Sequence, residues 1–230
     1  MAGTGVIEDY VTGLSRTLRG PRRPKLDMIT EARDSLLDSA EALESDGLRR
    51  DEAERAAVEE FGTIREIAPG YQEELSKSAG RRLAALLFVT VPLTAIMWSV
   101  IWKIFPTAPT AYEHTPAWFV PVARGVDMLQ MFIGVVGGLA LFALGRGLRG
   151  IRRPWLVTRF LGVFVWAMLP VMLVSCGALM FGSRDSAGFS DYPPGIAASL
   201  VSYALWAMQL YGAFRCLSVT RRVPAPAVAA

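Results

Sequence analysis

Residues 47–68 read GLRRDEAERAAVEEFGTIREIA, and this stretch decides how the N-terminal third of the chain folds. Gly47 predicts a helix stop, because glycine readily takes the positive φ found just after a helix. The alanine-rich segment 50–61 predicts a short helix that ends at Phe61-Gly62. Thr63 and Glu66 have the spacing of a capping box, which predicts the start of another helix. The stretch therefore indicates two helices joined at Phe61-Gly62.

Two further helices are predicted before this stretch. Residues 6–19 place apolar side chains at every fourth position, and Gly20-Pro21 ends that helix because proline cannot continue the hydrogen-bond ladder. Residues 24–46 carry an apolar stripe at helical spacing: Leu26, Ile29, Leu36, Ala40 and Leu43. After Thr63, Pro69-Gly70 is expected to break the helix, which resumes at Tyr71. Residues 1–80 are thus predicted to form a four-helix module with a small core.

A second face of the 24–46 helix is acidic. It carries five carboxylates at helical spacing: Asp27, Glu31, Asp34, Asp38 and Glu41. Like charges at this spacing destabilise a helix by about 0.2–0.5 kcal/mol per pair. We therefore expect the face either to be solvated or to meet a basic protein partner. A bound cation is a third interpretation, although the face has neither His nor Cys and no metal-binding loop.

The composition changes near Arg81-Arg82, where we expect a domain boundary. Residues 1–82 contain 13 Lys and Arg against 17 Asp and Glu, whereas residues 83–230 contain 11 against 4. The second part has four apolar runs long enough to cross a bilayer, at about 83–105, 126–144, 156–181 and 194–214. The predicted fold is all-α: a cytoplasmic four-helix N-terminal module over 1–80, a four-transmembrane-helix bundle over 81–217, and a disordered cytoplasmic tail over 218–230.

The basic residues lie in alternate loops. The loop between the second and third runs is rich in arginine and has no acid; it contains Arg146, Arg149, Arg152, Arg153 and Arg159. Other arginines lie just before the first run and just after the fourth. The positive-inside rule then places both termini in the cytoplasm of a multi-pass plasma-membrane protein, with the loop arginines at the lipid headgroups.

Small and amide side chains in the runs predict how the spans pack. Gly134-x-x-x-Gly138 lets two helices approach closely. We expect the partner helix to belong to the same bundle; a second copy of the chain is the alternative, which leaves a homo-oligomer open. Gln130 and Gln209 are expected to form hydrogen bonds between helices.

The remaining motifs argue against catalysis. Residues 145–150 match G-x-G-x-x-G but follow a membrane run instead of a strand, so a dinucleotide site is excluded. A single histidine, His114, cannot build a zinc site or a catalytic triad. The spans have no ionisable group at mid-depth, which argues against an ion-coupled carrier that works alone. We predict no enzymatic activity, no cofactor and no direct contact with nucleic acid.

The N-terminal pattern also resembles a known family. The first helix has spaced leucines and precedes Gly-Pro-Arg-Arg; then follow Glu31-x-x-Asp34-x-Leu36-x-Asp38, Gly47-Leu48, Glu52-Ala53, Ala57, Phe61-Gly62, Ile67-Ala68 and Tyr71. Over about residues 5–80, this pattern resembles the HAAS or permease-prefix domain common in actinobacterial membrane proteins. Thr63-Ile64 departs from it, since members often have a proline there. The resemblance implies a signalling or interaction module, found with PadR-type winged-helix regulators and with transporter-like membrane regions.

These observations favour a membrane-anchored signalling adaptor. Its module would bind a cytoplasmic partner, such as a PadR-type regulator, through Glu31, Asp34, Asp38, Phe61 and Gly62. The alternative is an accessory or degenerate permease subunit that works with an ABC ATPase. A third hypothesis is that the acidic module docks on the loop arginines of its own membrane face.

Overall fold

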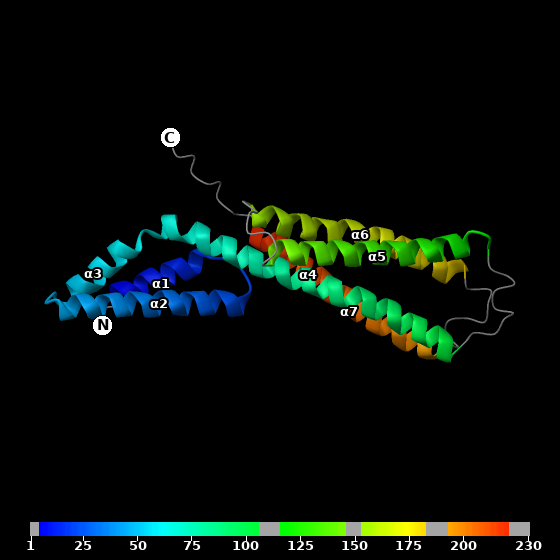
Figure 1. The fold of residues 1–230 in the computed structure, drawn as a ribbon, viewed down its shortest axis with the longest axis horizontal. Helices are drawn as coiled ribbons and strands as arrows, with labels where there is room; N and C mark the ends of the chain where they lie inside the picture. The colour runs from blue at the N-terminus through cyan, green and yellow to red at the C-terminus, as the bar shows by residue number, and fades with distance from the viewer. Residues whose placement is uncertain (1–4, 106–115, 146–152, 183–192, 221–230) are drawn as a thin grey trace, which may run out of the picture. The chain divides into compact units, whose positions relative to one another are not determined.

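The computed structural model describes residues 5–105, 116–145, 153–182 and 193–220, and these residues form seven helices and no strand (Figure 1). The helices belong to two compact units. The first contains Met1–Ala79 together with Ser218–Ala230, and the second contains Gly80–Leu217. The prediction of an all-α fold is confirmed, and the division of the chain lies one residue from the predicted boundary.

The first unit is built from α1 (Val6–Thr17), α2 (Arg22–Ser45), α3 (Arg50–Phe61) and the first part of α4 (Ile64–Ile104). Its core joins leucines from three of these helices, among them Leu14, Leu36 and Leu75, which are fully buried. Alanines at Ala53 and Ala57 are also fully buried, and their small side chains let α3 lie close to its neighbours. A core of this size stabilises a small domain only modestly.

The buried stripe of α2 includes Ala32, which was not predicted, and leaves out Leu26, which was. Ala32, Leu36 and Ala40 are buried, and Ile29 and Leu43 are partly buried against them. Leu26 was included in the predicted stripe, but half of it is exposed. The reason is position: Leu26 lies in the second turn of α2, before the helix meets its neighbours.

The helix break predicted at Pro69-Gly70 is wrong, because α4 runs without interruption over 41 residues. Pro69 lies in the second turn, where its missing N–H removes one hydrogen bond, to the carbonyl of Arg65. Arg65 is exposed, so water can satisfy that carbonyl. The buried residues Ala68 and Leu75 meanwhile hold this part of α4 against the core of the first unit.

The second unit contains the rest of α4 with α5 (Phe119–Leu144), α6 (Pro154–Gly182) and α7 (Pro193–Thr220). All four helices are long and apolar enough to cross a membrane. α5 begins at Phe119 instead of 126. α7 continues through 218–220, which were predicted to belong to the disordered tail, and Val219 and Thr220 are buried. The rest of that tail, 221–230, lies outside the described residues.

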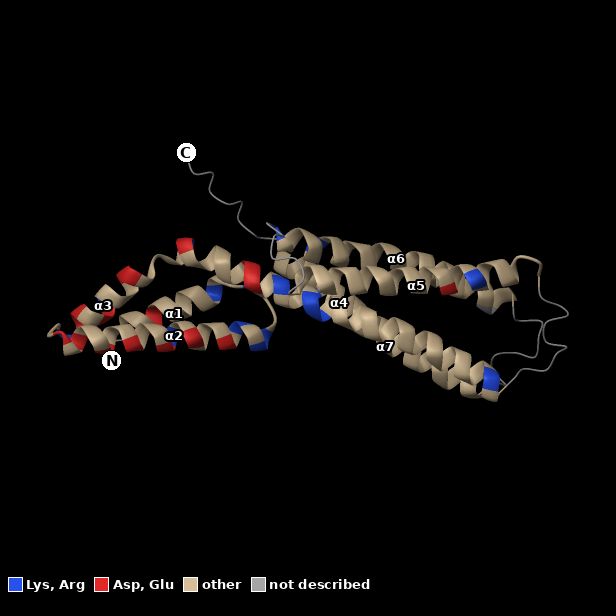
Figure 2. Cartoon of the chain, viewed as in Figure 1, with Lys and Arg blue, Asp and Glu red and all other residues tan. Residues whose placement is uncertain are grey.

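The outer surface of the second unit is apolar. Only 17–22% of the residues in the most apolar window of each helix are buried, so most of their side chains face outward. Large side chains such as Phe88, Met131 and Val174 are more than half exposed. Charged residues are frequent on the first unit and scarce along these helices (Figure 2). Such a surface suits hydrocarbon, and the chain is a membrane protein.

Different contacts join different helices of the second unit. α4 and α7 are joined by hydrogen bonds: Gln209 Nε2 donates to Thr90 Oγ1 at 2.8 Å, and Trp98 Nε1 donates to Ser202 Oγ at 3.2 Å. α5 and α6 are joined through the Phe132 and Phe164 rings, whose centroids are 5.9 Å apart. The bond from Gln209 is one of the two interhelical amide contacts expected from the sequence.

The glycines of α5 face α4. A Cβ on Gly134 would lie 3.6 Å from Val91, and one on Gly138 would lie 3.0 Å from the Phe88 ring. The tightest approach is at Gly137, where a Cβ would lie 2.8 Å from the Cβ of Leu87 and 3.1 Å from the backbone nitrogen of Phe88. These glycines therefore pack within the chain, and Gly137 allows the closest contact.

We predict that Gly137→Ala lowers the thermal stability of the full chain in detergent. The free energy of unfolding should fall by about 1–3 kcal/mol, because the added methyl group would crowd backbone and Cβ atoms of α4. Gly177→Ala on α6 is the matched control, since nothing lies within 4 Å of a Cβ at that position. The melting temperatures of both variants, compared with the parent, measure the effect. Equal changes in melting temperature for the two variants would show that the close contact at Gly137 does not contribute to stability.

Candidate interaction and coupling site

The junction between α3 and α4 is held by a tyrosine of α1. Tyr10 Oη donates a hydrogen bond to the carbonyl of Gly62 at 2.8 Å. Its ring also meets the Phe61 ring edge-on, with centroids 5.9 Å apart. Burial raises the pKa of Tyr10, and nearby Tyr71 and Glu66 raise it further, so the phenol stays protonated as a donor at neutral pH. We call Tyr10, Phe61 and Gly62 the corner.

Gly62 adopts a backbone conformation that other residues avoid. Its φ is +103° and its ψ is 165°, a region that is almost exclusive to glycine. The next residue caps α4: the N–H of Thr63 and its hydroxyl both donate to Glu66 Oε2, at 2.9 and 2.7 Å. These bonds lower the pKa of Glu66. The predicted pairing of Thr63 with Glu66 is therefore present. It differs from a full capping box in one bond. There the threonine hydroxyl accepts from the backbone N–H of the glutamate, whereas here the Thr63 hydroxyl donates to the Glu66 carboxylate.

We predict that Gly62→Ala destabilises the first unit by about 1–3 kcal/mol, because alanine is strained at this φ and ψ. Gly70→Ala is the control on the same helix: nothing lies within 4 Å of a Cβ there, and alanine favours a helix interior by about 0.5–1 kcal/mol. The rate at which a protease cuts the full chain between residues 5 and 80 measures both effects. Protection that is unchanged by Gly62→Ala would contradict the role given to the corner.

A second contact joins three distant segments through one amide. Gln72 Oε1 accepts from the N–H of Arg19 at 2.9 Å, and Gln72 Nε2 donates to the carbonyl of Arg19 at 2.7 Å. The same Nε2 lies 3.3 Å from the carbonyl of Val219, at the end of α7. Gln72 is 6% exposed and Val219 is 3% exposed, so these bonds are shielded from water. The end of α7 is thereby attached to α4 and to the α1–α2 connection.

Sequence reasoning missed Gln72. The available signal was a neutral polar residue on the face of α4 that also carries the buried residues Ala68 and Leu75, a position where an amide needs partners. The attachment of Val219 could not be predicted, because no local pattern relates residues 147 positions apart.

We predict that Gln72→Leu increases amide hydrogen exchange at Arg19 and lowers stability by about 1–3 kcal/mol, since buried backbone groups lose their partners. Glu74→Leu is the control on the same helix; Glu74 is exposed and forms only a surface ion pair with Lys77. Exchange followed by mass spectrometry, in the full chain, measures the effect. Exchange at Arg19 that responds equally to both variants would refute the contact.

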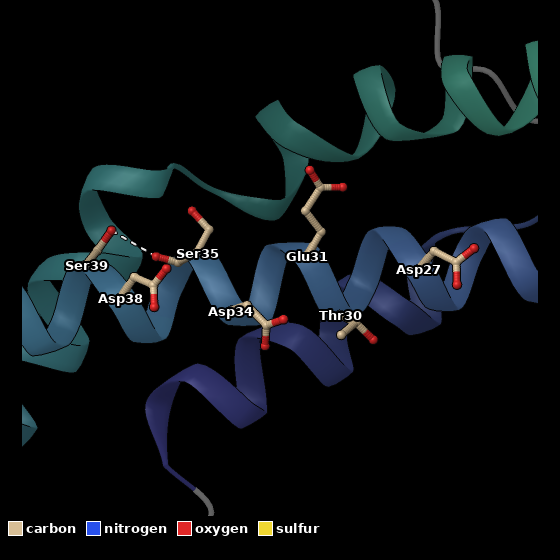
Figure 3. A pocket seen from close by; sticks show the side chains of 7 residues that line it. All are labelled: Asp27, Thr30, Glu31, Asp34, Ser35, Asp38 and Ser39. Atoms are coloured by element: carbon tan, nitrogen blue, oxygen red, sulfur yellow. Dashed lines mark hydrogen bonds between the residues drawn. The ribbon is translucent and has the colours of Figure 1, made fainter.

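The acidic face of α2 lies on the surface of the first unit (Figure 3). Asp27, Glu31, Asp34 and Asp38 are exposed, and they line a shallow open surface together with Thr30, Ser35 and Ser39. The carboxylates spread along the helix and do not converge on one point, and Glu31 points toward α4. Burial and the Glu31 carboxylate raise the pKa of Tyr71, in the part of α4 that precedes the span.

This surface suits an extended contact better than a single ion. No group of three or more His, Cys, Asp or Glu among the described residues could hold a metal. Some other acidic side chains of the first unit are paired, as Glu8 is with Arg33 and Glu54 is with Arg50. Asp34 and Asp38 form no ion pair with any described residue, so their charge is available to a partner.

Most of the arginines predicted to meet lipid headgroups cannot be placed, because Arg146, Arg149 and Arg152 lie outside the described residues. Arg153 is described; it is exposed and immediately precedes α6. Arg81 and Arg82 are also exposed, on α4 at the start of the second unit.

Comparison with known families gives one result. Residues 9–70 match the HAAS family model, so the first unit contains a HAAS domain. The match begins within α1, covers α2 and α3, and ends in the first turns of α4; it includes the acidic face, the corner and the backbone of Arg19. No curated protein and no solved structure matches the chain significantly.

Proposed function

We propose that this HAAS-containing membrane protein is a non-enzymatic signalling adaptor. Its HAAS domain would bind a cytoplasmic protein, a PadR-type winged-helix regulator, and its four membrane helices would hold that partner at the plasma membrane. The observation that carries the proposal is the continuity of α4, which begins in the HAAS domain and becomes a membrane span without a break. A partner bound to the domain would then be linked to a membrane span through one helix.

The acidic face is the surface we propose for the partner. Its exposed Asp34 and Asp38 have no ion-pair partner among the described residues, and they lie on a helix of 24 residues, long enough for a protein contact. A row of uncompensated charge attracts an oppositely charged protein and fixes its orientation, more than it adds to affinity. Phe61 is half-buried against the core of the domain, where its ring meets that of Tyr10.

The charge distribution supports a cytoplasmic location for the HAAS domain and for both termini. Exposed Arg81, Arg82 and Arg153 belong to segments that the positive-inside rule places on the cytoplasmic side. Arg215 lies near the end of α7, on the same side by this rule, and its guanidinium is 5.6 Å from the centre of the Tyr211 ring. Anionic lipid headgroups on that side would meet these arginines.

We predict that the double charge reversal Asp34→Lys with Asp38→Lys abolishes recovery of a PadR-type regulator with the full chain purified from membranes. Glu59→Lys with Glu60→Lys is the matched control, since these exposed acids lie on α3 and change the net charge equally. Quantitative mass spectrometry of the co-purified proteins measures the effect.

Two outcomes would count against the proposal. If both double variants weaken recovery equally, net charge and not the acidic face attracts the partner. If an ABC ATPase is recovered instead of a regulator, the accessory-permease alternative is favoured.

A further inference from the structure

The four membrane helices of the second unit line a small, partly open cavity of about 60 Å³. Most of its wall is apolar, and the sulfur-containing side chains of Met168 and Met172 belong to it. Three polar side chains also line it: Thr94 from α4, Gln130 from α5 and Gln209 from α7. A polar lining in the apolar part of a membrane protein is costly unless each group has a hydrogen-bond partner.

The described residues satisfy only part of the hydrogen-bonding capacity of these three polar side chains. Gln209 Nε2 donates to Thr90 Oγ1 at 2.8 Å, which leaves its carbonyl oxygen as an acceptor. The Thr94 hydroxyl donates to the carbonyl of Thr90 at 2.7 Å and keeps lone pairs that can accept. Gln130 forms no hydrogen bond with any residue that the structure describes, although its amide has two donors and an acceptor. The unmet groups thus include both donors and acceptors.

The volume of the cavity decides which molecule can bind there and form hydrogen bonds with these side chains. A cavity that binds benzene in another protein measures about 150 Å³, whereas one water needs about 10–15 Å³. At about 60 Å³, the space is too small for an organic ligand of that size and large enough for a few waters. Water both donates and accepts, and three polar side chains around it supply the two to four partners that a buried water requires.

We propose that this cavity is a hydration site, in which a small cluster of ordered waters joins Gln130 to Gln209 and Thr94. The waters supply a polar connection where α5 otherwise meets α4 through its glycines. α4 and α7 are hydrogen-bonded to each other, and α5 meets α6 through aromatic rings. The hydrated cavity adds a polar link between α5 and the α4–α7 pair. This site is independent of the partner proposed for the HAAS domain.

X-ray radiolytic footprinting of the full chain in lipid nanodiscs tests the proposal. Radiolysis of a bound water produces hydroxyl radicals beside it, and methionine sulfur is readily oxidised. Met168 and Met172 line the cavity, whereas Met131 and Met208 are 67% and 54% exposed on the outer surface, where lipid replaces water. We expect severalfold faster oxidation of Met168 and Met172 than of Met131 and Met208.

Variants of the amides separate bound water from general access of radicals. Gln130→Leu and, separately, Gln209→Leu should lower oxidation of Met168 and Met172 to the rate of the outer methionines, while circular dichroism shows that the helices are retained. If the first variant does not fold, the second carries the test. Equal oxidation of all four methionines in the parent chain would overturn the proposal, as would a folded variant that keeps the fast oxidation of Met168 and Met172.

Discussion

The continuity of α4 over 41 residues is the feature on which the rest of the structure depends. It persists through Pro69 because this proline removes only one hydrogen bond near an exposed end, while Ala68 before it and Leu75 after it are buried. The same helix supplies Gln72 to the first unit and Thr90, Thr94 and Trp98 to the second. The helical backbone therefore continues from the first unit into the second.

The sequence predicted the elements well wherever a local physical rule controls them. Apolar periodicity located α1 to α3, and the positive φ of Gly62 agrees with the stop predicted there. The apolar runs located four helices that can span a membrane. The error at Pro69-Gly70 arose because tertiary burial outweighed an intrinsic helix breaker. The ends of α5 and α7 were misplaced because hydropathy marks the apolar core of a span and not the polar turns that extend it.

Less of the candidate site could be predicted. The acidic spacing on α2 placed Asp34 and Asp38 on an exposed surface, as a helical face requires. The contacts that organise the unit join residues far apart in the chain: Tyr10 with Gly62, and Gln72 with both Arg19 and Val219. No spacing rule relates such positions. The GxxxG motif identified the right helix, yet the closest approach is at Gly137, between its two glycines, because the facing surface of α4 decides which one is nearest.

The length of α4 has a mechanical consequence. At about 1.5 Å per residue, its 41 residues extend about 60 Å, roughly twice the hydrocarbon thickness of a bilayer. A helix that spans a membrane adjusts its tilt when bilayer thickness changes. About 28 Å of this length precedes the span, and that part of α4 carries Ala68 and Leu75. A change in bilayer thickness thus acts on the same helix that contributes Ala68 and Leu75 to the core of the first unit.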